Sequence, residues 1–208
     1  MSRVSGETRR RGRPSTGVRD AVLAATEAIL AESGVARLST KEIARRASVA
    51  ESSIFYHFTD RLGLLQAVVH RHLPRYKEVA VQVRQRAGTG SLRDNLVDLL
   101  DGLDAFYERI TPILAAVQAD GELRALLADR GAGGEIGPQR ALLPIAAYLT
   151  EERRLDRVRA GLDVDSTALL IVGAAHQRAV YRYLTGAGTA LPSTGDIVDT
   201  LLPALLND

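Results

Sequence analysis

Residues 39–61 have the sequence STKEIARRASVAESSIFYHFTDR, in which two helical patterns flank a short interruption. The first pattern begins with a capping box: we expect the Ser39 hydroxyl to accept from the backbone near Glu42, and the Glu42 carboxylate to bond back. Ile43 gives this helix an apolar side. The interruption is residues 48–50, so the stretch predicts a helix-turn-helix.

The second helix of this stretch has an apolar and a polar side. Its apolar contacts are expected from Ile54, Phe55 and Phe58. The other side chains are hydroxyls, a carboxylate, a phenol and an imidazole: Glu51, Ser52, Ser53, Tyr56 and His57. The second helix of a helix-turn-helix lies in the major groove of DNA. The polar side therefore predicts contacts with DNA.

The chemistry of these side chains assigns them to bases or to phosphates. A hydroxyl donates or accepts at a base edge, and a phenol ring packs on a thymine methyl. Three side chains are expected at base edges: Ser52, Ser53 and Tyr56. Three are expected at phosphates: Thr40, His57 and Arg61. Glu51 either accepts a hydrogen bond from a cytosine amine or only disfavours binding to incorrect DNA sites.

Positive charge is concentrated in the N-terminal part of the 208 residues. Residues 1–61 hold 11 Lys+Arg against 7 Asp+Glu, whereas residues 62–208 hold 16 against 18. Residues 1–17 contain five Arg and lack apolar periodicity, which predicts a flexible basic arm. Its Arg-Gly-Arg-Pro resembles an AT-hook, in which Arg11 and Arg13 contact the minor groove. The alternative is a basic tail that binds DNA without preference.

Helical periodicity continues along the rest of the chain, without a strand pattern. A helix is expected over residues 18–33, ended by Gly34, and another after Asp60, which Pro74 breaks or kinks. Five more are expected at 92–110, 112–129, 138–156, 165–185 and 194–206. The fold class is therefore all-α.

Several classes of protein are disfavoured by composition. The chain has no Cys, and its four His lack the spacing of a metal site, so neither a metal nor a cofactor is expected. We find no run of about 18 apolar residues, no nucleophile with a base and no cofactor loop. We expect a cytoplasmic protein without membrane contact that is not an enzyme. Substrate-dependent turnover would support the alternative, a helical enzyme.

A further pattern is the order of residues in and around the helix-turn-helix. It consists of Leu38-Ser39-Thr40, Ile43-Ala44, Ala47, Val49, Ile54-Phe55-Tyr56-His57-Phe58, Arg61 and Leu64-Leu65. In this order the chain resembles the TetR family of bacterial regulators over about residues 18–70. It departs from the family at three positions: Ser48 replaces a turn glycine, Ala50 replaces a capping Ser or Thr, and Phe55 replaces a phosphate-binding Tyr.

The resemblance implies three segments: a flexible basic arm (1–17), a three-helix helix-turn-helix DNA-binding domain (18–64), and a helical ligand-binding and dimerisation domain (65–208). A homodimer is expected through the helices near 165–185 and 194–206. Polar and aromatic groups on apolar helices are candidates for a pocket, although each has a core or surface role as its alternative: Phe106, Tyr107, Gln118, Tyr148, His176 and Gln177.

The function that the resemblance implies is sequence-specific regulation of transcription. We expect a repressor that binds an inverted repeat in double-stranded DNA and is released by a small-molecule ligand. The alternative is an architectural DNA-binding protein without an inducer. A preference for an inverted repeat over random DNA would separate these two functions.

Overall fold

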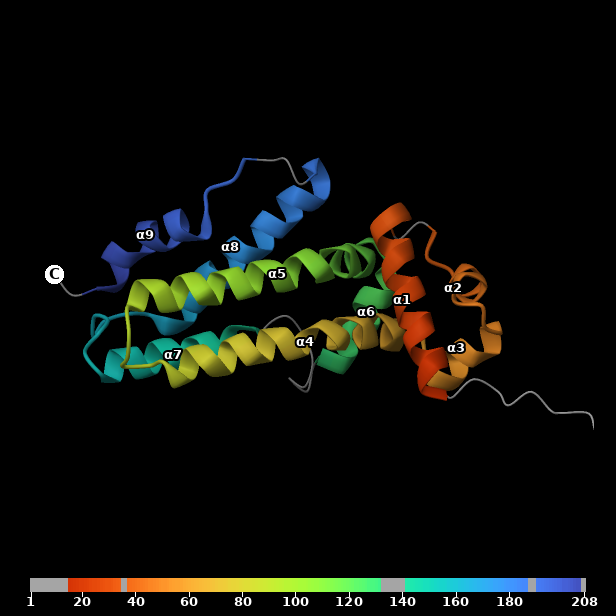
Figure 1. Cartoon of the computed structure of the whole chain (residues 1–208), viewed down its shortest axis with the longest axis horizontal. Helices are drawn as coiled ribbons and strands as arrows, with labels where there is room; N and C mark the ends of the chain where they lie inside the picture. Colours follow the sequence, from red (N-terminus) through yellow and green to blue (C-terminus); the bar gives the residue numbers. More distant parts are fainter. Residues whose placement is uncertain (1–14, 35–36, 132–140, 187–189, 207–208) are drawn as a thin grey trace, which may run out of the picture. The chain divides into compact units, whose positions relative to one another are not determined.

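The computed structural model describes residues 15–34, 37–131, 141–186 and 190–206, and every regular element in these ranges is helical (Figure 1). The helices are α1 (Ser15–Ser33), α2 (Thr40–Ala47), α3 (Glu51–His57), α4 (Arg61–Gln85), α5 (Leu92–Ala119), α6 (Gly121–Gly131), α7 (Leu142–Arg154), α8 (Val164–Thr185) and α9 (Thr194–Leu205). The predicted all-α class is confirmed. The chain divides into two compact units, residues 1–64 and 65–208, and α4 begins in the first and continues in the second.

The N-terminal unit is a small helical domain in which α1 packs against α2 and α3, and α2 against α3. The predicted apolar side of α1 is buried: Val22, Ala25, Ile29 and Leu30. At the end of α1, Gly34 has a left-handed φ of 64° and donates its N–H to the Leu30 carbonyl at 3.1 Å. This is the predicted glycine stop, because a residue without a Cβ adopts that conformation without strain.

In the C-terminal unit α5 is the central helix. It packs against α6, α8 and α9, while α7 packs against α8 (Figure 1). Leucines on α5 and small and β-branched residues on α8 supply the core: Leu96, Leu99, Leu100, Leu103, Ala168, Ile171 and Ala175. Small residues at such an interface let two helix axes come close.

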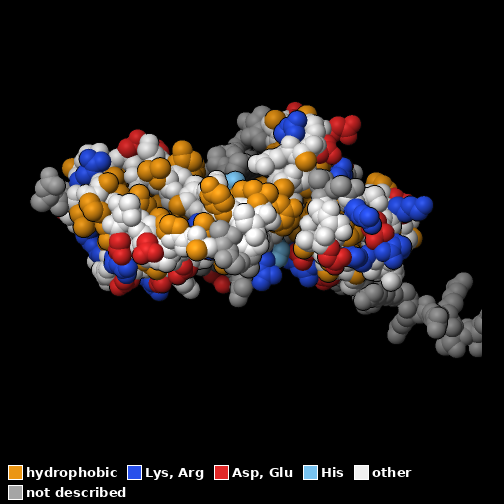
Figure 2. All heavy atoms as spheres, turned by 90° about the horizontal axis from the view of Figure 1, so that it is seen from above, with side chains coloured by type: hydrophobic (Ala, Val, Ile, Leu, Met, Phe, Trp, Pro, Cys, Tyr) orange, Lys and Arg blue, Asp and Glu red, His pale blue; other side chains and the backbone are white. Residues whose placement is uncertain are grey.

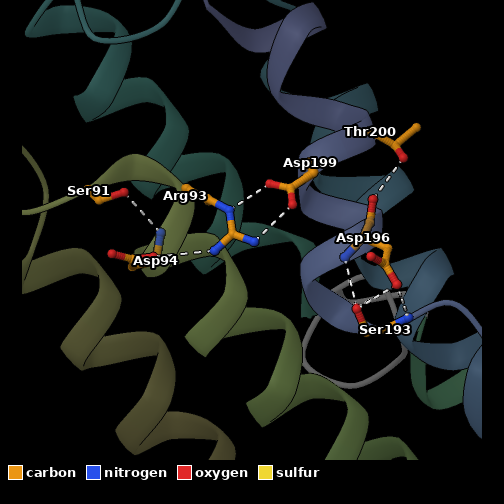
Figure 3. A network of polar contacts seen from close by, with 7 residues as sticks. All are labelled: Ser91, Arg93, Asp94, Ser193, Asp196, Asp199 and Thr200. Atoms are coloured by element: carbon orange, nitrogen blue, oxygen red, sulfur yellow. Dashed lines mark hydrogen bonds and ion pairs between the residues drawn. The ribbon is translucent and has the colours of Figure 1, made fainter.

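Polar contacts fix α9 on this core. Arg93 on α5 makes a two-pronged ion pair with Asp199 on α9 (Figure 3). A capping box begins α9, with Ser193 accepting from the Asp196 N–H and Asp196 accepting from the Ser193 N–H. Arg159 donates to backbone carbonyls in the last turn of α9. Side chains therefore hold both ends of this helix.

The helices differ from the predicted boundaries at two prolines. Of the break or kink expected at Pro74, the break is absent, because α4 continues through that residue. The predicted end at residue 110 is wrong, because α5 continues through Pro112 to Ala119. A proline inside a helix costs about 3 kcal/mol because it removes one N–H donor and crowds the preceding turn. Beyond Pro112 the apolar side of α5 stays buried through Ile113 and Val117. Burial of two such side chains contributes about 3–6 kcal/mol, enough to offset the proline.

Candidate nucleic-acid interface

The turn between α2 and α3 contains a non-glycine residue in the left-handed conformation. Ser48 has φ 54° and ψ 46°. Its N–H and that of Val49 donate to the carbonyls of Arg45 and Ala44, which closes the end of α2. The TetR pattern has a glycine at this position, and Ser48 adopts the left-handed conformation that favours glycine.

Helix α3 is anchored by two side chains that are one helical turn apart. Ile54 is 3% exposed and Phe58 is 5% exposed. Phe55, which was also expected to make apolar contacts, is 58% exposed, so that prediction is wrong. Residues at i and i+4 share one side of a helix, whereas the next residue is rotated by about 100°. Phe55 therefore lies outside the core that Ile54 and Phe58 enter.

The polar side of α3 is open to solvent. Tyr56 is 84% exposed. Glu51 and Ser52 are exposed as well, whereas Ser53 and His57 are half-buried. The Tyr56 and His57 rings meet edge to face, with centroids 5.1 Å apart. The structure thus brings the five polar residues predicted on α3 together on a short helix whose apolar side is buried.

The start of α3 lacks a side-chain cap. Ala50 occupies the N-cap position with an extended backbone, and no side-chain hydrogen bond is formed there. Glu51, the first residue of the helix, instead accepts a hydrogen bond from the Thr40 hydroxyl at the start of α2. Both residues were predicted as DNA contacts, but their contact with each other was not expected.

The residues between α3 and α4 include the predicted cap. Asp60 Oδ1 accepts from the Gly63 N–H at 2.7 Å, as expected for an N-cap. Arg61 is the first residue of α4 and is half-buried. Above the end of α3, Arg19 of α1 lies over the Phe58 ring, 5.6 Å from its centroid. This cation–π contact ties α1 to the end of α3.

The polar residues of α2 differ from the prediction. Ser39 accepts from the Glu42 N–H at 3.1 Å, which confirms half of the capping box. The Glu42 carboxylate does not bond back but accepts two hydrogen bonds from Arg45, at 2.8 and 2.6 Å. These hydrogen bonds lower the pKa of Glu42. An arginine three residues away reaches both carboxylate oxygens, which a backbone N–H cannot do.

Two basic residues of α2 were missed as candidate DNA contacts. Lys41 and Arg45 are both exposed and lie four residues apart, on one side of the helix. The i, i+4 spacing of two cations was visible in the sequence and indicates such a side. Arg11 and Arg13, the predicted minor-groove contacts, lie outside the described residues.

The candidate pocket residues of the C-terminal unit fall into three groups. Phe106, Tyr107 and His176 are together: the Tyr107 ring lies 5.4 Å from Phe106 and 5.2 Å from His176. Burial raises the pKa of Tyr107 to about 12. Gln118 and Gln177 are exposed on the unit's surface. The aromatic cluster therefore joins α5 to α8 without the two glutamines.

Tyr148, the remaining pocket candidate, belongs to a separate buried polar cluster. Its hydroxyl and one oxygen of the fully buried Glu152 have no well-directed hydrogen bond among the described residues. Burial raises the pKa of Tyr148, and the neighbouring Glu152 raises it further. The other Glu152 oxygen accepts from the Gly88 N–H at 3.3 Å, and Arg157 pairs with the carboxylate at 3.1 Å. These contacts tie α7 to the segment between α4 and α5.

The described ranges also bear on metal binding and on membrane insertion. No group of three or more His, Asp or Glu side chains is arranged to hold a metal ion there. Of the helices in those ranges, none combines the length and the apolar character that a membrane span needs.

Known proteins match the N-terminal unit in sequence. Residues 22–68 fit the profile of the bacterial regulatory proteins of the tetR family, a segment that covers α2, α3, most of α1 and the start of α4. In these residues the chain matches the TetR family. The matched segment includes the helix-turn-helix built around Ile54 and Phe58.

A curated relative matches over a similarly short segment. The HTH-type transcriptional repressor BepR of Brucella suis biovar 1 (strain 1330) is 34% identical over 64 residues. The alignment spans 31% of this chain and 31% of BepR. The sequence relationship thus covers less than a third of either protein.

Solved structures match over nearly the whole chain. SmeT, the repressor of the Stenotrophomonas maltophilia multidrug efflux pump SmeDEF, is 25% identical with a TM-score of 0.61, covering 91% of each chain. A SmeT–triclosan complex gives 25% identity, a TM-score of 0.60 and 92% coverage of each chain. NalD, the secondary repressor of the MexAB-OprM multidrug efflux pump in Pseudomonas aeruginosa, is 18% identical, with a TM-score of 0.61 over 94% of this chain and 99% of NalD. The similarity of fold therefore extends through the C-terminal helices.

The surface of the C-terminal unit carries exposed apolar side chains. Figure 2 looks onto the side where such side chains gather over α8 and α9. On α8 the large ones that are exposed are Leu169, Leu170, Tyr181, Tyr183 and Leu184. Between them Gly173 is exposed, and a Cβ there would meet no atom within 4 Å. A monomer gains nothing from such a stripe, which is typical of a protein interface.

Proposed function

We propose that the protein is a homodimeric, DNA-binding transcriptional regulator that represses from an inverted-repeat operator and is released by a small molecule. The observation that carries this proposal is the recognition helix: Ile54 and Phe58 anchor it, and Tyr56 stands 84% exposed on its polar side. In this proposal residues 18–64 contact DNA, and residues 65–208 hold the ligand and the partner subunit. Such a regulator acts in the cytoplasm, where bacterial DNA lies.

A dimer is supported by the apolar stripe of α8. One helix-turn-helix reaches few base pairs, and a twofold dimer contacts two half-sites about 34 Å apart. Leu169, Leu170 and Leu184 expose apolar area along one helix, and Gly173 lets a second helix approach closely. The neighbouring α9 is held by Arg93 at Asp199 near its middle and by Arg159 at its last turn, so it offers a firm second helix to the interface.

Repression and release by a ligand are supported by the relatives. BepR and SmeT are described as repressors, and SmeT forms a complex with triclosan. In this chain the cluster of Phe106, Tyr107 and His176 joins the two helices α5 and α8. A molecule that binds between these rings would move α5 and α8 relative to each other. It releases DNA only to the extent that it binds the DNA-free state of the protein more tightly than the DNA-bound state.

The decisive experiment measures operator binding by Tyr56→Ala and Arg61→Ala over a series of salt concentrations. Both substitutions should weaken binding, and Arg61→Ala should also reduce the salt slope by about one per half-site, since one phosphate contact is lost. Tyr56→Phe keeps the ring and removes the hydroxyl, so it shows how much each of them contributes to DNA binding. Arg84→Ala, at an exposed arginine of the C-terminal unit, is the matched control and should keep the wild-type slope.

Two results would contradict the proposal. If both variants bind DNA with wild-type affinity and wild-type salt dependence, the recognition helix does not contact the DNA. Equal affinity of the wild type for an inverted repeat and for random DNA would favour an architectural DNA-binding protein instead.

A further inference from the structure

Thr40 and Glu51 connect the first residues of the two helices of the helix-turn-helix. The Thr40 hydroxyl donates to Glu51 Oε1 across 11 residues of sequence. Thr40 is half-buried, whereas Glu51 is exposed. A β-branched side chain has few χ1 rotamers, so Thr40 is a stiff donor. The glutamate, which would otherwise sample many rotamers at the surface, is held in place by it.

The number of protons on Thr40 limits what else it can bind. A threonine hydroxyl has a single proton to donate, and a phosphate oxygen can only accept. While the Thr40 hydroxyl donates its proton in the hydrogen bond to Glu51, it has no other proton to donate to a DNA phosphate. The carboxylate, in contrast, has about four lone-pair sites and keeps accepting capacity after taking one bond.

The remaining capacity of Glu51 suits one base. In the major groove the N4 amine of cytosine is a donor, whereas O6 and N7 of guanine and O4 of thymine are acceptors that repel a carboxylate. Adenine has a donor at N6 but an acceptor beside it at N7. A carboxylate held at the start of a recognition helix therefore favours cytosine.

We propose that Thr40 is a positioning residue that holds Glu51 for the selection of cytosine at one position of each half-site. The inference rests on the proposed function and refines it: Thr40 acts through Glu51, not through a phosphate. A purely structural role for the pair, tying α2 to α3, would stabilise the domain without changing which base is preferred.

The experiment determines base preference at every operator position. An operator is first selected from random DNA with the wild-type protein, and competition with single-base variants then gives relative affinities for the wild type, Thr40→Val, Thr40→Ser, Glu51→Gln and the Thr40→Val/Glu51→Gln double variant. Valine keeps the shape of threonine without the hydroxyl, and serine keeps the hydroxyl. Thermal unfolding of each variant checks that it is folded.

The wild type should prefer cytosine at one position by roughly tenfold, the usual size of a specific base contact. Glu51→Gln should lose most of this preference, Thr40→Val should lose several-fold of it, and Thr40→Ser should retain it. In the double variant, Thr40→Val should cause no loss of cytosine preference beyond that caused by Glu51→Gln. If Thr40→Val weakens binding to all bases equally, the inference is overturned while the proposed function stands. If the wild type selects no operator, the proposed function itself fails.

Discussion

Arg93 on α5 and Asp199 on α9 form a two-pronged ion pair, with Nε–Oδ1 at 2.6 Å and Nη2–Oδ2 at 2.9 Å. The hydrogen bonds from Arg93 lower the pKa of Asp199. The pair is about half exposed, so water and salt weaken it. Its geometry nevertheless fixes the register of α9 on α5.

Asp199→Asn should therefore cause a small and salt-dependent loss of stability. We expect the thermal midpoint to fall by about 1–2 °C at low salt, and the difference to disappear in molar salt. Because the pKa is lowered in the folded state, the contribution is present at neutral pH and is lost as pH falls through that pKa. Thermal scans of the variant and of Asp101→Asn, at an exposed carboxylate of α5, test this. Equal losses in both variants at all salt concentrations would refute it.

Asp104 should make a larger contribution, since two arginines of α8 bind it in a less exposed place. Arg182 donates at 2.8 Å, and Arg178 at 3.2 and 3.3 Å. Burial raises the pKa of Asp104, but the bonds from Arg182 and Arg178 outweigh it, and the net pKa is lowered. Asp104→Asn should reduce the free energy of unfolding at pH 7 by roughly 1.5–3 kcal/mol.

The acid dependence of this difference gives a second readout. A lowered pKa in the folded state stabilises above the unfolded pKa of about 3.9, and the stabilisation disappears as pH falls through the folded value. Urea titrations between pH 7 and pH 3 should therefore show the wild type approaching Asp104→Asn at the acid end. A gap that stays constant over this range would mean that the carboxylate charge is not the cause.

Ser48→Gly should stabilise the helix-turn-helix. Ser48 has a left-handed backbone that costs a residue with a Cβ about 1 kcal/mol or more, and glycine removes this cost. The greater freedom of glycine in the unfolded chain offsets part of the gain. We expect a net gain of about 0.5–1 kcal/mol in urea unfolding. Ser33→Gly, at the helical end of α1, should be neutral or destabilising, so a gain there of the same size would contradict this cause.

Leu170→Glu should dissociate the proposed dimer. Leu170 is 60% exposed on the apolar stripe of α8, and a twofold axis would bury it twice. Charge in place of two leucines should raise the dimer dissociation constant more than about tenfold, measured by sedimentation equilibrium. Leu143→Glu, at a similarly exposed leucine of α7, should leave it unchanged. If Leu143→Glu dissociates the dimer and Leu170→Glu does not, the interface lies elsewhere.

Sequence alone predicted the features that depend on neighbouring residues. The glycine stop of α1 at Gly34, the Ser39 cap of α2 and the Asp60 cap of α4 are formed as expected. Each needs only a residue type and a backbone conformation within a few positions. The buried side of α1 follows for the same reason, because helical periodicity is local.

The features that sequence did not predict depend on tertiary contacts. Phe55 is hydrophobic, but it is exposed because the side of α3 that carries Ile54 and Phe58 is the side that packs on the core. Asp104 binds Arg178, which lies 74 residues away in the sequence. Helical spacing relates only residues of one helix, so it cannot predict this contact. A helix end was expected at residue 110, but buried residues beyond Pro112 continue α5. Thr40 and Glu51 were each assigned to DNA, because nothing in their spacing shows that they meet.

The caps of the helices differ in a way that affects when each helix forms. Asp163 accepts from the Asp165 and Ser166 N–H groups at the start of α8, and the Ser193–Asp196 box begins α9. At the start of α3 there is only Ala50, without a side-chain cap. We therefore expect amide hydrogens in the first turn of α3 to exchange with deuterium sooner than those of α8 and α9. On the proposed function, the last part of the recognition helix to become ordered does so against the DNA.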